Sequence, residues 1–255
     1  MAYILNDSTI FRIAERKFPE RRPNLVEIYI NPFDIYYLSV GDKVFEGNFL
    51  AVRWAVKQGI RSYTFMNETV KVGNVECLVY LHEDGFKWDW RTCQTAARNG
   101  HLNCLVYLHE NGCEWNLNVS LAAALGGHLD CVQYLHEQGC PWNWATCTYA
   151  AMYGHLHCLV YAHENGCPWD WRTCEYAAWK GHLNCLVYAH ENGCPWNEST
   201  CYEAADNGHL DCLHYALEHG CPFSDWICES ILHPDILSYL KDKGLCNSSL
   251  SNLDG

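Results

Sequence analysis

The side chains of this chain that are best suited to chemistry are its cysteines and histidines, which number 17 and 14 among 255 residues. Cysteines can form disulfides, bind a metal ion as thiolates, or fill a core as small apolar side chains. Sixteen of them recur at a fixed spacing in three sets, which are named after the elements predicted below. The outer-helix cysteines are Cys77, Cys104, Cys131, Cys158, Cys185 and Cys212, the loop cysteines are Cys113, Cys140, Cys167, Cys194 and Cys221, and the inner-helix cysteines are Cys93, Cys147, Cys174, Cys201 and Cys228.

The spacing of these sets argues against structural disulfides. Members of one set lie one repeat apart, and packed helices are about 8–10 Å apart, whereas a disulfide needs Cα atoms about 4.4–6.8 Å apart. Pairing outer-helix with inner-helix cysteines would leave Cys131 without a partner, because Ser120 replaces one inner-helix member. The total is odd, and only Cys246 falls outside the three sets. We therefore expect no structural disulfides.

The same spacing argues against a metal site. His182 and Cys185 are three residues apart and could start a two-ligand set, but no second pair with suitable spacing completes four ligands, and no Cys-x-x-Cys motif is present. We expect no metal and no cofactor, and we interpret the cysteines as buried, reduced thiols that act as small core residues.

Two sets of histidines and one set of tryptophans follow the same spacing. First-turn histidines begin the predicted outer helices, last-turn histidines end them, and loop tryptophans come next. We hypothesise that each last-turn histidine pairs with a glutamate of a neighbouring repeat. The tryptophans are predicted to join adjacent repeats, with a ligand-stacking strip as the alternative. The three sets are His101, His128, His155, His182 and His209; His82, His109, His136, His163 and His190; and Trp88, Trp115, Trp142, Trp169 and Trp196.

A 27-residue repeat positions all of these side chains. In the unit 181–207, apolar residues at helical spacing predict an outer helix over residues 182–192, which Gly193 ends and Pro195 prevents from continuing. Asn197 is predicted to cap a short inner helix that contains the pair Ala204-Ala205. Two short helices cannot bury their apolar faces alone, so the units are expected to stack.

The unit resembles the ankyrin repeat. Gly181-His182-Leu183, then Gly193-Cys194-Pro195-Trp196-Asn197, then Thr200 to Ala205 follow the order of the family pattern. The family unit has about 33 residues, and the missing residues fall between Asn197 and Thr200, where the family builds a β-hairpin. The resemblance implies an all-α fold, an α-solenoid of stacked helix-turn-helix repeats with shortened loops and few or no β-hairpins. The amino-acid pattern of the repeat is similar to that of divergent ankyrin-like arrays in large DNA viruses of amoebae.

The repeat also predicts the domain organisation. Residues 1–46 lie outside the clean repeat and are expected to form an N-terminal capping segment, because terminal units need a modified outer face. Residues 47–244 are predicted to form an array of about seven to eight units. Pro234 and Asp235 begin the last predicted helix, which Gly244 closes, and residues 245–255 are expected to be a polar tail.

Composition limits the function classes. The net charge of -13 disfavours nucleic-acid binding. No apolar run approaches the roughly 18 residues of a membrane span, and no secretory signal is seen, so we expect an intracellular protein (in the host cytoplasm if viral) without a membrane partner. No nucleophile–base pair or phosphate-binding loop stands outside the repeat, so we expect no enzyme activity. The resemblance implies a protein–protein interaction scaffold with a protein partner.

The candidate binding residues flank the alanine pair of each inner helix, where side chains change from unit to unit. By the family geometry these residues face the concave side, and aromatic residues, Met and Arg are enriched in interface cores. The alternative for these side chains is packing between neighbouring inner helices. The alternative functions are a ubiquitin-ligase substrate adaptor recruited through residues 1–46 and a structural virion component. The candidates are Arg98, Tyr149, Met152, Tyr153, Tyr176, Trp179, Lys180, Tyr202 and Asp206.

Overall fold

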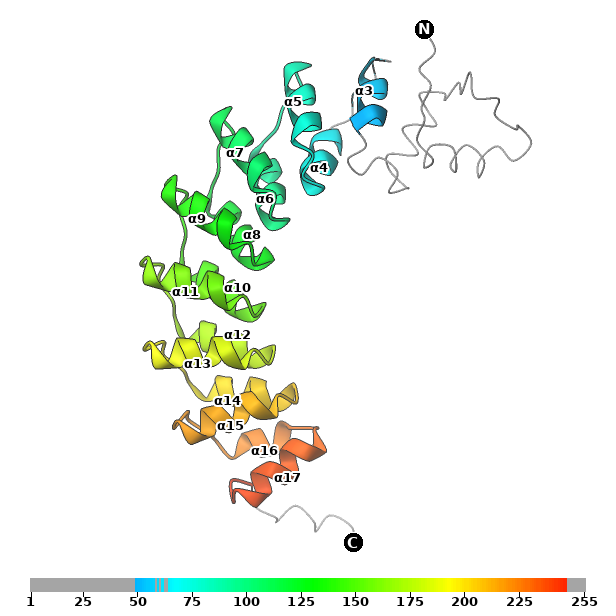
Figure 1. Cartoon of the computed structure of the whole chain (residues 1–255). Helices are drawn as coiled ribbons and strands as arrows, with labels where there is room; N and C mark the ends of the chain where they lie inside the picture. Colours follow the sequence, from blue (N-terminus) through cyan, green and yellow to red (C-terminus); the bar gives the residue numbers. More distant parts are fainter. Residues whose placement is uncertain (1–48, 58, 60, 62–63, 247–255) are drawn as a thin grey trace, which may run out of the picture. The chain divides into compact units, whose positions relative to one another are not determined.

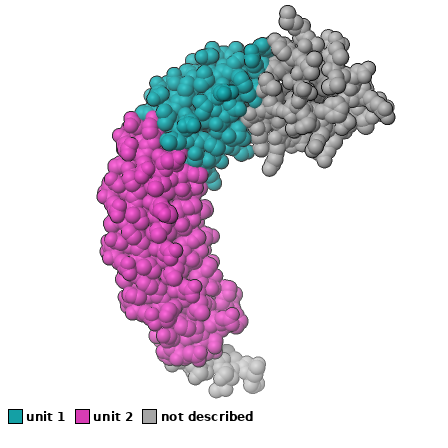
Figure 2. Space-filling view, in the orientation of Figure 1, with its two compact units in different colours: residues 1–114 teal, residues 115–255 magenta. Residues whose placement is uncertain are grey.

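The computed structural model describes residues 49–57, 59, 61 and 64–246, and these contain α-helices and no β-strand. The capping segment predicted for residues 1–46 lies outside the described residues. The chain divides into two compact units, Met1–Glu114 and Trp115–Gly255 (Figure 2). In the part of the chain that is described, no helix combines the length and the apolar character that crossing a bilayer requires.

Short helices follow one another through both units (Figure 1). The first unit holds α3 (Phe49–Lys57), α4 (Thr64–Lys71), α5 (Val75–Glu83), α6 (Trp90–Arg98) and α7 (Leu102–Glu110). The second unit holds α8 (Leu117–Gly126), α9 (Leu129–Glu137), α10 (Trp144–Met152), α11 (Leu156–Glu164), α12 (Trp171–Trp179), α13 (Leu183–Glu191), α14 (Glu198–Asp206), α15 (Leu210–Glu218), α16 (Trp226–Ser230) and α17 (Pro234–Asp242).

The helices of the second unit form an inner and an outer row. Inner helices α8, α10, α12 and α14 pack extensively on one another, whereas outer helices α9, α11, α13 and α15 touch their neighbours less. Each inner helix packs against the outer helix that follows it, as α12 does against α13. The predicted period of 27 residues is confirmed. The two helices that pack as a pair, however, are the inner helix of one predicted unit and the outer helix of the next.

The alanine pairs let the inner helices approach closely. Ala177 and Ala178 of α12 are completely buried, and the same holds for the pair in α10 and in α14. Caps fix where each inner helix begins, and the predicted cap is confirmed: the side chain of Asn197 accepts a hydrogen bond from the backbone N–H of Ser199 at 3.0 Å. At the other end of the chain, α17 begins at Pro234 as predicted, and Gly244 follows it with a left-handed backbone.

The recurring Gly-His pair ends one helix and joins it to the next repeat. At Gly154 the backbone φ is +74°, which only glycine adopts without strain. A Cβ atom placed there would lie 2.7 Å from Nδ1 of His182, the first-turn histidine of the following repeat. The equivalent ring of His155 reaches back, with Nε2 3.1 Å from the carbonyl oxygen of Leu125. Two constraints therefore favour glycine at position 154. One is the positive φ, and the other is the histidine ring of the next repeat, which leaves no room for a Cβ atom.

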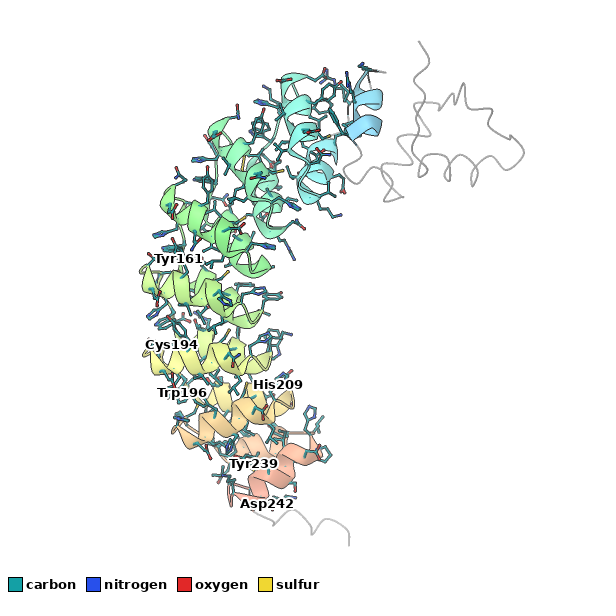
Figure 3. All side chains as sticks on the ribbon, in the orientation of Figure 1. Tyr161, Cys194, Trp196, His209, Tyr239 and Asp242 are labelled. Atoms are coloured by element: carbon teal, nitrogen blue, oxygen red, sulfur yellow. A yellow bond between two sulfur atoms is a disulfide. The ribbon has the colours of Figure 1, made fainter. Side chains whose placement is uncertain are left out.

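A second contact between repeats involves a histidine, a tryptophan and a tyrosine at the opposite end of the helix pairs. The ring of His163 stacks on Trp169 at 3.7 Å between centroids, and its Nδ1 lies 3.0 Å from the hydroxyl of Tyr188 in the next repeat. Figure 3 marks the two ends of the helix pairs by Trp196 and His209, which lie on opposite sides of the stack in this view. The same bond joins His82 to Tyr107, His136 to Tyr161 and His190 to Tyr215.

This contact corrects the hypothesis of histidine–glutamate pairing. The Nδ1 atoms of these histidines bond tyrosine hydroxyls rather than carboxylates. The loop tryptophans do join adjacent repeats, but by packing on the histidine of their own repeat and the tyrosine of the next, as Trp196 does with His190 and Tyr215.

The expectation of no disulfides is wrong for one pair, because the structure joins Cys228 to Cys246 with Cα atoms 5.7 Å apart. Cys93 and Cys113 face each other at the equivalent place, with Cα atoms 7.0 Å apart, which is just outside the disulfide range. In both pairs an inner-helix cysteine meets a cysteine in the loop that follows the next outer helix. The comparison of outer-helix with inner-helix cysteines does not include this contact. Cys246 therefore belongs with the loop cysteines, at a slightly shorter spacing. The remaining thirteen cysteines are free and buried, which agrees with their interpretation as small core residues.

Gly154→Ala is expected to destabilise the protein more than Gly166→Ala. Both glycines have φ near +80°, so each alanine costs about 1–2 kcal/mol. A Cβ atom at Gly166 meets open space, whereas at Gly154 it overlaps His182, which adds about 1–3 kcal/mol. Urea unfolding of the two variants measures the difference. Equal losses of unfolding free energy would show that the His182 ring moves away freely.

The unfolding free energy is expected to fall as the pH drops from about 7.5 to about 5.5, through the ordinary histidine pKa near 6.5. Burial lowers the pKa of His182 and of His190, and neighbouring histidines lower both further. The unfolded chain therefore takes up protons first, and acidification favours unfolding. Urea unfolding at both pH values should show the fall, and His190→Gln should reduce it. Greater stability at the lower pH would instead support histidine–glutamate pairing.

Candidate protein-binding face

One stripe of each inner helix of the second unit remains open to solvent. In α12 the half-buried residues Trp171, Glu175 and Trp179 are spaced four apart, so they share one helix face. The other side of the helix, which includes Cys174 and Ala178, is completely buried against neighbouring helices. We call the open side of α10, α12 and α14 the inner-helix stripe.

The C-terminal end of α10 contributes three of the candidate residues to this stripe. Tyr153 is 44% exposed, and Tyr149 and Met152 are half-buried. The rings of Tyr149 and Tyr153 are parallel, with centroids 6.5 Å apart, and Tyr153 also lies parallel to His155. These side chains therefore pack on one another locally and still present their rings to solvent.

The next helix, α12, contributes the candidates Tyr176 and Trp179, and Lys180 follows directly. The rings of Tyr176 and Trp179 meet edge to face at 5.7 Å. The ammonium group of Lys180 lies 3.9 Å from the centroid of the Trp179 ring, a cation–π contact at an exposed site. The ammonium group of Lys180 thus covers one face of the Trp179 ring.

The third helix, α14, contributes Tyr202 and Asp206, which are both half-buried. The ring of Tyr202 packs on Trp226 of α16 at 5.1 Å. Arg98 is exposed at the end of α6 and belongs to the first unit. None of the nine candidate residues is fully buried, and eight of them lie on α8–α16 of the second unit or directly after one of these helices.

The first turn of the inner helices carries residues that the sequence analysis missed. The guanidinium group of Arg172 lies 4.7 Å from the centroid of the Trp144 ring and 4.9 Å from that of Trp171, and it pairs with Asp170 at 2.7 Å. Trp144 is 39% exposed. The four-residue spacing of Trp171, Glu175 and Trp179 predicts that the first turn belongs to the same helix face. The candidate residues come only from beside each alanine pair, so the first turn is not included.

Two carboxylates on the stripe carry an unfavourable charge. Partial burial raises the pKa of Glu175, and the neighbouring charge of Glu203 raises it further, although Arg172 acts in the opposite sense. Partial burial likewise raises the pKa of Glu203, and Asp206 adds to the effect. A cation placed between these groups would relieve the repulsion.

The chemistry available on the stripe is recognition through aromatic faces and negative charge. Aromatic rings bind apolar groups and the faces of cationic groups, and carboxylates accept hydrogen bonds from arginine and lysine. Within the described ranges, no group of three or more histidine, cysteine, aspartate or glutamate side chains is arranged to hold a metal ion.

Comparison with known proteins identifies the repeat and the fold. Residues 94–170 match the family model for ankyrin repeats, in three copies. The crystal structure of the human ASB11 ankyrin repeat domain is similar over 72% of this chain and 98% of that chain, with a TM-score of 0.60 and 18% sequence identity. No curated protein sequence matches this chain. The chain therefore contains ankyrin repeats and has the fold of an ankyrin-repeat solenoid, whose repeats generally serve as protein–protein interaction modules and as non-enzymatic scaffolds.

Proposed function

We propose that this chain is a non-enzymatic scaffold that binds a protein partner through the inner-helix stripe. The observation that carries the proposal is the run of partly exposed aromatic side chains on three successive inner helices. The buried residues beneath them repeat from unit to unit. Tyr149, Tyr176 and Tyr202 instead stand at repeat positions where the type of side chain differs between units. Repeated residues build the stack, and exposed aromatic residues are the side chains that supply most binding energy in interfaces.

The carboxylates of the stripe indicate a partner segment that carries arginine or lysine. Glu175 and Glu203 repel each other in partly buried positions, and the whole chain has a net charge of -13. Arg172, seated over Trp171 and paired with Asp170, shows how an arginine fits between a ring and a carboxylate on this surface. An arginine of the partner would make the same two contacts near Tyr202 and Glu203.

Three finer predictions rest on the sequence alone and stay predictions. They are a source in a large DNA virus, with an intracellular location in the host, the role of a ubiquitin-ligase substrate adaptor through residues 1–46, and the role of a structural virion component. Residues 49–57, 59, 61 and 64–246 contain no feature that favours any of them over a plain binding scaffold.

Replacing Tyr153 and Trp179 together by alanine is expected to abolish partner capture by the full-length chain. The exposed ring of Tyr153 and the half-buried ring of Trp179 are the proposed anchors, and truncation of such anchors typically costs about 2 kcal/mol or more of binding free energy each. Captured proteins are quantified by mass spectrometry after incubation of immobilised protein with cell lysate. Because neither residue is fully buried, the thermal midpoint should stay nearly unchanged.

A matched control removes exposed apolar surface elsewhere. Leu210→Ala with Leu232→Ala truncates one exposed side chain in the outer row and one in the loop before α17. This variant should retain every partner that the unmodified chain captures. Retention of the same proteins by the Tyr153 and Trp179 variant would refute the proposal, and its loss of folding would place these residues in the scaffold.

Glu203→Gln is expected to raise stability at neutral pH while it weakens capture of the partner. A carboxyl group whose pKa is raised on folding loses stability as the pH rises through that pKa, so the neutral amide removes the loss. The gain in urea midpoint should be present at about pH 7 and should vanish near pH 4, where a glutamic acid side chain is largely protonated. Capture should decline, because a charge that faces the basic segment is gone.

Glu164→Gln is the control for this exchange, since Glu164 is exposed at the end of outer helix α11. It should leave both the urea midpoint and the captured proteins unchanged. If Glu203→Gln lowered stability at neutral pH, the repulsion described for this carboxylate would be absent.

A further inference from the structure

Three repeats of the second unit bring an inner-helix cysteine into contact with a loop cysteine twenty residues later. Both members of each pair belong to one packed helix pair, the first on the inner helix and the second just after the glycine that ends the outer helix. The same place holds the disulfide between Cys228 of α16 and Cys246 after α17, and the pair formed by Cys93 of α6 and Cys113 after α7. The three pairs that remain free thiols are Cys147 with Cys167, Cys174 with Cys194, and Cys201 with Cys221.

Backbone groups position the two thiols of a pair. Sγ of Cys147 lies 3.9 Å from the carbonyl oxygen of Cys167, and the thiol of Cys167 donates to the carbonyl oxygen of Asn143 at 3.2 Å. The backbone N–H of Cys167 donates to Ala162 at 2.9 Å, which fixes the loop on the end of α11. In the next repeat, Cys194 (labelled in Figure 3) lies with its carbonyl oxygen 4.0 Å from Sγ of Cys174. The inner-helix thiol of Cys147 and that of Cys174 thus each lie against the backbone of the loop cysteine with which they would bond.

We propose that these three thiol pairs are disulfide-forming sites that close when the chain meets an oxidised small-molecule disulfide. In the first step, the thiolate of the loop cysteine attacks one sulfur of the small disulfide, forms a mixed disulfide and releases one thiolate. In the second step, the inner-helix cysteine gives up its proton and its sulfur attacks the loop-cysteine sulfur, which releases the second small thiol. Two protein thiols are oxidised to one disulfide, and one small disulfide is reduced to two thiols.

The surroundings assign the attacking role to the loop cysteine. The interaction between the two side chains lowers the pKa of Cys167 and raises that of Cys147. Cys221 is lowered in the same way by Cys201. Since the thiolate is the nucleophile, Cys167 and Cys221 react first in their pairs. These thiols are almost fully buried, so the reagent reaches them during local opening of the loop.

One repeat provides a natural control. Ser120 stands where the other inner helices have cysteine, and its hydroxyl donates to the carbonyl oxygen of Pro141 at 2.7 Å. Cys140, the loop cysteine of that repeat, therefore has no thiol partner at this place, and burial raises its pKa to about 11. The assignment requires Cys140 to stay a free thiol under conditions that close the three pairs.

Closure would tie the inner helix to the end of its outer helix in the three repeats that carry the inner-helix stripe. Each bond closes a loop of twenty residues, and loops of this size constrain the unfolded chain strongly. The formation of these bonds does not depend on partner binding, so this inference stands apart from the proposed function.

The test maps the disulfides of the full-length protein before and after oxidation. The chain is fully reduced, incubated for hours with oxidised glutathione, then denatured, alkylated and digested for mass spectrometry. We expect linked peptides for the pairs of α10, α12 and α14 and complete alkylation of Cys140. The thermal midpoint of the oxidised protein should exceed that of the reduced protein, and added reductant should remove the difference.

Two variants sharpen the test. Cys147→Ser copies the residue found at position 120, so the fold tolerates it, and it should abolish only the linked peptide of Cys167. Cys185→Ser, which changes a buried outer-helix cysteine, should leave all three linked peptides in place. Complete alkylation of Cys167, Cys194 and Cys221 after oxidation would overturn the proposal, as would linkage of these cysteines to partners other than the inner-helix cysteine twenty residues earlier.

Discussion

The close packing of neighbouring inner helices is the constraint on which the rest of this structure depends. The alanine pair at the centre of each inner helix is completely buried, and only side chains of this size let successive helices come so near. Outer helices touch each other less, so they need other contacts between repeats. The His182 ring over Gly154 at one end, and the His163–Tyr188 bond at the other, supply them. The Gly-His turn and the histidine–tryptophan–tyrosine contact thus follow from the geometry of the inner row.

The same constraint separates scaffold from binding surface. A nine-residue helix such as α12 that commits Cys174, Ala177 and Ala178 to its neighbours leaves Trp171, Glu175 and Trp179 on the opposite side. Nothing in the stacking geometry determines which side chains stand there, and this is where the repeats differ most. Trp171 and Trp179 are half-buried and keep part of each ring open to solvent. The proposed partner would cover this remaining aromatic surface.

Local signals in the sequence predict the repeat unit well, and contacts between units poorly. The caps at Asn197, the glycine turns and the burial of the cysteines depend on hydrogen bonds and apolar spacing within a few residues, so they could be inferred directly. The contacts His163–Tyr188 and Cys147–Cys167 join residues 25 and 20 positions apart. These contacts depend on which helices pack as a pair. The repeat pattern is equally consistent with pairing each outer helix with the inner helix after it and with pairing each inner helix with the outer helix after it. The missed residues Trp144 and Arg172 touch across repeats for the same reason.

The acidic residues of the inner-helix stripe lie in less favourable places than the other acidic residues of the chain. Acidic residues that serve only solubility lie on exposed surfaces, as Glu164 and Glu191 do at the ends of outer helices. Glu175 and Glu203 instead occupy half-buried places beside aromatic rings, where each raises the free energy of the folded chain. A repeat array tolerates such a local loss, because its stability is a sum over many similar interfaces between neighbours. Charges that weaken the fold at one aromatic stripe, in a chain with ample exposed surface for acidic residues, support the proposal that this stripe binds a basic segment of a partner.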